Sequence, residues 1–181
     1  MRSLRGHLLV AGPGLDDPNF RRTVVLVGEH GDEGAMGVVL NRVSTVTVDE
    51  AVPPMVPLTG PDEPVYLGGP VQPQAVVVLA DFEDPGAAEA IVVDDVGFLP
   101  GEVEDAGDLG ELRSVRVFAG YAGWGPGQLE SELVEGAWLV LEGRGSDVFT
   151  SAPDSLWSDV LRREGGAYAV LALLPDDPRV N

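Results

Sequence analysis

The sequence predicts an α+β fold in a single compact domain, residues 1–181, with short β-strands and three or four helices. Short valine-rich apolar runs, bounded by glycine or proline, predict the strands. The few segments with helical periodicity do not alternate regularly with these strands, which disfavours a doubly wound parallel sheet. Hydrophobic residues make up 44% of the chain and aromatic residues only 6%, so the core must consist mainly of valine, leucine and alanine.

Strands dominate the first half of the chain. A turn at Asp17 and Pro18, capped by the aspartate, separates the first two strands. The glycine-bounded turn at residues 31–34 predicts that the second and third strands form a hairpin. Residues 47–50 match the capping-box pattern and predict one helical turn. The strands expected in this half are residues 5–11, 23–28, 36–40, 65–67 and 75–80.

Residues 52–64 form a distinct segment because they contain five prolines. Each proline fixes one backbone dihedral angle and removes an amide donor, so we expect a stiff, extended loop here. An ordered surface connection is the favoured role for this loop, and a segment that docks a partner is the alternative.

The second half combines strands with the clearest helices. A helix is predicted at residues 128–135, and the best amphipathic helix covers residues 153–163, with Leu156 and Val160 on its apolar stripe. Residues 167–174 are apolar throughout, so a buried strand and a buried helix both fit. The strands expected in this half are residues 90–93, 115–119 and 137–141.

The charge balance narrows the range of partners. The chain has 30 acidic residues against 11 basic ones, a net charge of −19, and every basic residue is an arginine. A field of that sign repels phosphate backbones, so we do not expect direct nucleic-acid binding. The lack of lysine excludes a Walker-type phosphate lysine and any Schiff-base mechanism, and the lack of cysteine excludes disulfides and thiolate chemistry.

No segment predicts a membrane or secretory location. The apolar run after the N-terminus, residues 8–11, is shorter than a signal-peptide core, and no stretch approaches the roughly 18 apolar residues of a membrane span. We therefore expect a soluble cytoplasmic protein with no membrane partner.

The most distinctive segment is Gly120–Glu130, GYAGWGPGQLE, at a predicted strand-to-helix bend. Its glycines bring backbone close either to another part of the fold or to a ligand. Three interpretations remain open: a structural loop in which Tyr121 and Trp124 pack and Glu130 caps the helix, a ligand or peptide cleft walled by the aromatic rings, and a nucleotide site. The third is disfavoured, because Pro126 removes an amide donor and Glu130 already occupies the positive end of the helix dipole.

Glu29 and His30 form the second candidate site. A histidine beside a carboxylate can act as a general base or bind a metal ion, and the alternative is a turn histidine hydrogen-bonded to backbone or to a carboxylate. The chain has only two histidines and lacks the HExxH, EF-hand and GxSxG patterns. We therefore assign no catalytic residue, and we expect neither a cofactor nor a metal ion.

Four ordered motifs resemble those of the AlgH/YqgE family of bacterial proteins, over nearly the whole chain. The motifs are residues 6–11 with 17–20, residues 29–30 with 34–42, residues 68–71, and residues 120–130. One departure lies at residues 78–80, where many members of the family carry a histidine that this chain lacks. The resemblance implies a compact α+β fold with a mixed, largely antiparallel, barrel-like sheet, a cytoplasmic location and, through the family's name, a role in transcriptional regulation.

The polar residues of these motifs fall in turns that flank apolar strands, so we expect them to line a common cleft. The candidate cleft residues are Asn19, Arg22, Glu29, His30, Asn41, Arg42, Tyr121, Trp124, Gln128 and Glu130. The leading hypothesis is a non-catalytic regulatory module that binds an unidentified protein or small molecule there. The alternatives are a small hydrolase that uses His30 as base, oriented by Glu29 or Glu130, and a transcriptional regulator that acts without contacting DNA.

Overall fold

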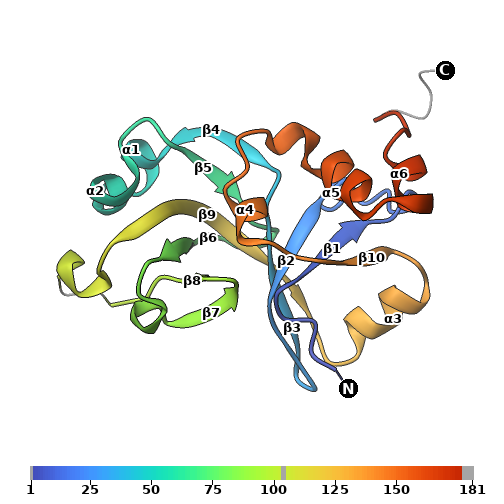
Figure 1. The fold of residues 1–181 in the computed structure, drawn as a ribbon, viewed down its shortest axis with the longest axis horizontal. Coiled ribbons are helices and arrows are strands. Elements are labelled where there is room, and N and C mark those ends of the chain that lie inside the picture. The colour runs from blue at the N-terminus through green and yellow to red at the C-terminus, as the bar shows by residue number, and fades with distance from the viewer. Residues whose placement is uncertain (1, 103–104, 177–181) are drawn as a thin grey trace.

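The computed structural model describes residues 2–102 and 105–176, and it confirms the α+β class (Figure 1). The strands are β1 (His7–Ala11), β2 (Val24–Gly31), β3 (Gly34–Val39), β4 (Val43–Thr47), β5 (Pro64–Leu67), β6 (Val71–Phe82), β7 (Ala90–Val93), β8 (Val96–Phe98), β9 (Leu112–Trp124) and β10 (Trp138–Glu142). The helices are α1 (Val48–Ala51), α2 (Val56–Thr59), α3 (Gln128–Val134), α4 (Gly145–Val148), α5 (Leu156–Glu164) and α6 (Gly166–Leu171).

All ten strands belong to one mixed, largely antiparallel sheet. Adjacent strands in the sheet follow the order β10-β1-β2-β3-β9-β6-β8-β7. Strand β4 pairs with β5, and β5 in turn pairs in parallel with β9. The two ends of this order, β10 and β7, do not pair with each other in the part of the chain that the structure describes. The sheet is therefore open, and the barrel-like closure expected from the family resemblance is not reached.

The core lies on both faces of the sheet. In β1, Leu8 and Val10 point to one face and Leu9 and Ala11 to the other, and all four side chains are buried. Helices α5 and α6 cover the first face, whereas α3 covers the second (Figure 1). Burial on both faces explains why the strand is a continuous apolar run instead of an alternating one.

Two local predictions hold in detail. The β2–β3 hairpin pairs Gly31 with Gly34, as the turn residues predict. Helix α1 begins with a complete capping box, in which the Thr47 side chain accepts from the Glu50 amide and the Glu50 carboxylate accepts from the Thr47 amide.

The prediction of an extended loop at residues 52–64 is wrong. The segment contains a 3-10 turn, Pro53–Met55, followed by helix α2. Pro53 and Pro57 occupy first-turn positions, where a helical amide has no acceptor and proline therefore costs no hydrogen bond. Helices α2 and α4 have only four residues each, too short for periodicity to reveal, so the described residues contain six helices where three or four were expected.

Residues 167–174 are largely helical, and they are not buried as a whole. Helix α6 covers residues 166–171, while Val170 and Leu173 are exposed and Ala172 is buried. The apolar run is thus a helix that packs on α5 along one side only.

The Gly120–Glu130 segment is less of a loop than its composition predicts, because β9 continues through Trp124 before α3 begins. Gly120 has a φ of 74°, at the point where β9 changes from β5 to β3 as its neighbour. Gly68 fills the junction: its amide donates to the Ala119 carbonyl at 2.9 Å, and its carbonyl accepts from the Val39 amide at 2.8 Å. The glycines therefore bring backbone close to another part of the fold.

Side chains have no room at this junction. A Cβ atom at Gly69 would collide with the Tyr121 backbone, and one at Gly120 would collide with the Gly69 carbonyl oxygen. Two family-like motifs, residues 68–71 and 120–130, thus pack against each other through bare backbone.

We predict that Gly120→Ala lowers the free energy of unfolding by more than about 2 kcal/mol, because the added methyl meets both a positive φ and the Gly69 carbonyl. Chemical denaturation measures the change. Gly14→Ala is the matched control, since a Cβ there has no atom within 4 Å and φ is not positive. Equal stability of the two variants would contradict the packing argument.

Candidate functional site

The ten candidate cleft residues lie in several places instead of one. His30, Trp124, Gln128 and Glu130 surround the start of α3. Arg22, Asn41 and Arg42 line a surface depression, and Asn19 lies in the turn beside it. Glu29 lines a different groove, and Tyr121 pairs with Val71 in the sheet. Arg22 and His30 stand eight residues apart along extended chain, so roughly 25 Å separates the first two groups.

The Glu29–His30 turn and the Gly120–Glu130 segment do meet, through a pair of side chains 100 residues apart. His30 Nε2 lies 2.6 Å from Glu130 Oε1, and His30 Nδ1 accepts a hydrogen bond from the Leu4 amide at 2.9 Å. Because Nδ1 is an acceptor, the ring proton sits on Nε2 and is donated to the carboxylate. Both ring nitrogens are engaged, and the His30 side chain is only 2% exposed.

Glu130 acts as the anionic partner of this pair. The hydrogen bond from His30 is the largest cause that lowers the pKa of the Glu130 carboxyl, and the Glu130 backbone amide adds to it. The carboxylate also lies in the first turn of α3, where the helix dipole favours a negative charge. The arrangement fits a structural clamp that holds the N-terminal segment, the hairpin and α3 together.

Glu132 links α3 to two tryptophan side chains, and the sequence did not predict this contact. Its Oε2 accepts from the indole N–H groups of Trp124 at 2.7 Å and Trp138 at 2.9 Å. The two indoles meet edge to face at 6.0 Å, and Phe20 packs against both. Trp124 is therefore a buried structural residue, as expected if the Gly120–Glu130 segment has a structural role.

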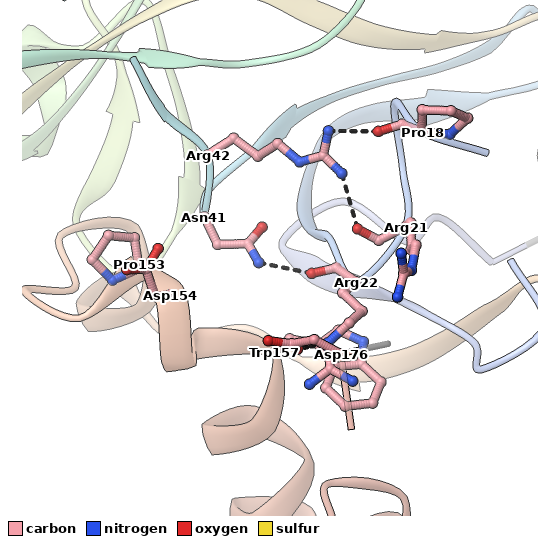
Figure 2. A pocket seen from close by; sticks show the side chains of 9 residues that line it. All are labelled: Pro18, Arg21, Arg22, Asn41, Arg42, Pro153, Asp154, Trp157 and Asp176. Atoms are coloured by element: carbon pink, nitrogen blue, oxygen red, sulfur yellow. Dashed lines mark hydrogen bonds and ion pairs between the residues drawn. The ribbon is translucent and has the colours of Figure 1, made fainter. Parts of the chain in front are cut away.

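The arginine-lined depression is a polar surface pocket with a volume of about 520 Å³ (Figure 2). Its residues come from the β1–β2 loop, the end of β3, the start of α5 and the segment after α6. They are Pro18, Arg21, Arg22, Asn41, Arg42, Pro153, Asp154, Trp157 and Asp176.

Asn41 and Arg42 shape the wall of this depression. Asn41 accepts from the Val24 amide and donates to the Arg22 carbonyl, both at 2.9 Å, and so completes the start of β2. Arg42 donates to the carbonyls of Pro18 at 2.7 Å and Arg21 at 2.9 Å (Figure 2). Burial lowers the pKa of the Arg42 guanidinium, but arginine still remains charged at neutral pH.

Arg22 joins the β1–β2 loop to the C-terminal part of the fold. Its guanidinium stacks on the Trp157 ring at 4.0 Å, and its Nε lies 2.7 Å from Asp176 Oδ1. The same side chain donates to the Leu174 carbonyl at 3.0 Å. Its backbone φ of 54°, unusual outside glycine, turns the chain toward this contact.

Arg21 differs from both neighbours. Its side chain is exposed at the depression and has no hydrogen-bond or ion-pair partner among residues 2–102 and 105–176. Of the three arginines, it alone has all its guanidinium donors directed to solvent. Of the residues that line this site, Arg22, Asn41 and Arg42 were expected from the sequence to line a cleft, whereas Arg21, Trp157 and Asp176 were not.

The described residues contain no group of three or more acidic or histidine side chains placed to hold a metal ion. In the same part of the chain, no helix has the length and apolar character needed to cross a membrane.

Comparison with known proteins identifies relatives of the whole chain. A family model described as AlgH-like matches residues 8–169. An UPF0301 protein of Streptomyces avermitilis is 44% identical over 99% of this chain and 96% of its own length, and one of Streptomyces coelicolor is 43% identical with the same coverage. The solution structure of the AlgH protein from Pseudomonas aeruginosa superposes with a TM-score of 0.72 at 30% identity, covering 96% of this chain and 95% of that one. A crystal structure of a Corynebacterium diphtheriae protein gives 0.85 at 28% identity, covering 96% and 93%.

We predict that the stability contributed by Glu130 is lost in acid. Since its folded pKa is lowered, the contribution is complete above the unfolded pKa, near 4.5, and disappears as pH falls through the lower folded value. Glu130→Gln should therefore cost about 1 kcal/mol at neutral pH and progressively less as the pH falls below about 4.5. Urea denaturation across this range tests it, with the exposed Glu135→Gln as control. A difference that stays constant with pH would contradict the assignment.

We predict that Glu132→Ala lowers the free energy of unfolding by about 3 kcal/mol, because two enclosed indole N–H groups lose their acceptor. Glu132→Gln should cost about 1 kcal/mol, since its amide oxygen can still accept both bonds. Denaturation followed by tryptophan fluorescence measures both variants. Indistinguishable values for Ala and Gln would show that the shared acceptor is unimportant.

Proposed function

The chain belongs to the AlgH-like family, and we propose that it is a non-catalytic binding module whose ligand carries a carboxylate or phosphate group. The proposed site is the depression lined by Arg21, Arg22 and Arg42. The observation that carries the proposal is that three of the 11 arginines of a protein with net charge −19 surround one depression.

The contacts already present in the depression support an anionic ligand. The Asp176 carboxylate forms an ion pair with the Arg22 guanidinium, although the Asp176 side chain is 87% exposed. This guanidinium therefore already binds a carboxylate that belongs to a surface segment. Arg22 and Arg42 are held by backbone carbonyls, so little side-chain entropy remains for them to lose on binding. Arg21 supplies uncommitted donors, and Trp157 supplies an apolar floor.

The geometry of His30 supports binding over hydrolysis. The hydrolase hypothesis needs an imidazole nitrogen free to take a proton, whereas Nδ1 accepts from Leu4 and Nε2 donates to Glu130. His30 is also far from the depression, at the opposite end of β2.

The wider proposal concerns where and how the module acts. We place it in the cytoplasm as one domain over residues 1–181. If it influences transcription, it does so through its ligand or a protein partner, because its net charge of −19 opposes contact with DNA.

We predict that Arg21→Ala weakens the binding of succinate and of inorganic phosphate about tenfold, the loss expected for one charge-assisted contact. Calorimetric titration measures the affinity, and recovery of unaltered succinate checks that no reaction occurs. Arg162→Ala is the control, because it removes the same charge from the exposed face of α5. Equal losses in both variants, or no binding by the wild type, would refute the site.

A further inference from the structure

A second groove lies between the β2–β3 hairpin and strands β6, β7 and β8. Its volume is about 330 Å³, and Met36, Val77 and Phe98 form an apolar floor. Gly28 makes this floor possible, since a Cβ at that position would lie 2.6 Å from the Phe98 ring. The groove and the arginine-lined depression share no lining residue.

One wall of the groove is an unpaired strand edge. Strand β8 pairs with β6 from Leu79 to Asp81, and the last bond of this ladder runs from the Leu99 amide to the Val78 carbonyl at 3.0 Å. Backbone direction alternates along a strand, so the N–H and C=O groups of Val76 point the same way as those of Val78. No strand among the described residues pairs with Val76 on that side, and its side chain is 48% exposed.

The two rims of the groove carry carboxylates. Glu29 stands at the bulge of β2, Glu89 precedes β7, and both side chains are exposed. Neither has an ion-pair partner in the part of the chain that the structure describes. An apolar floor with a free strand edge and acidic rims matches an extended segment that carries basic side chains beside apolar ones.

We propose that this groove binds an extended cationic segment of a partner protein, which adds to the β6 edge at Val76 and places arginine or lysine side chains against Glu29 and Glu89. A second copy of this chain fits poorly, because edge-to-edge pairing would bring two molecules of net charge −19 together with their acidic rims facing.

The test uses the full chain and a short fluorescein-labelled peptide of alternating arginine and valine, with fluorescence anisotropy as the measurement. The double variant Glu29→Gln with Glu89→Gln should weaken binding about fivefold, as expected for two exposed ion pairs. The control double variant Glu33→Gln with Glu83→Gln removes the same charge outside the groove and should bind like the wild type. A peptide with N-methylated valines keeps its charge but loses amide donors, and it should bind at least about tenfold more weakly.

Several outcomes would overturn the proposal. Equal losses in the two double variants would reduce the interaction to general charge attraction. Unchanged binding of the N-methylated peptide would exclude strand addition. Self-association of the wild type in sedimentation velocity, relieved by peptide, would assign the edge to a second copy of the chain instead.

Discussion

The fold depends on one constraint: β9 can exchange one neighbour for another only where backbone meets backbone. On a single edge, β9 runs beside β5 and then beside β3, and Gly68 bridges the gap with one hydrogen bond to each of β9 and β3. Gly69 and Gly120 leave no space for a side chain on either segment. This contact joins the two halves of the sheet, so packing explains why glycine occupies positions 68, 69 and 120.

Helix α3 follows the end of β9, and it organises the aromatic core. Glu130 and Glu132 are two residues apart, so their side chains leave the helix in directions about 200° apart. One therefore reaches His30 and the other reaches the indoles of Trp124 and Trp138. A helix of seven residues is short for independent stability, and these two carboxylates anchor it from both sides. The polar residues of this region thus stabilise the fold, and they are separate from the arginine-lined depression.

Local chemistry explains which parts of the structure were predictable. The hairpin at residues 31–34 and the capping box of α1 follow from neighbouring residues, and both form as predicted. The helical turns within residues 52–64 were missed because proline content indicates equally an extended loop or the first turn of a helix. The His30–Glu130 pair joins positions 100 residues apart; the sequence named Glu29 and Glu130 as possible partners of His30, and only the folded chain shows that Glu130 is the partner. The arginine-lined depression was predicted only in part, through Arg22, Asn41 and Arg42, because its walls come from four separate segments.

The net charge of −19 acts differently on the two surfaces. A cationic segment approaching Glu29 and Glu89 is attracted by the whole molecule, so long-range steering accelerates its association. Physiological salt screens the repulsion between the protein and an approaching anion beyond about 8 Å, so the net charge opposes binding at Arg21 only at shorter range. The binding of an anion must then rest on short-range, directional guanidinium contacts, which depend on ligand geometry. For the proposed anion site, the excess of acid therefore disfavours polyanions such as nucleic acid and favours small ligands that fit between the arginines.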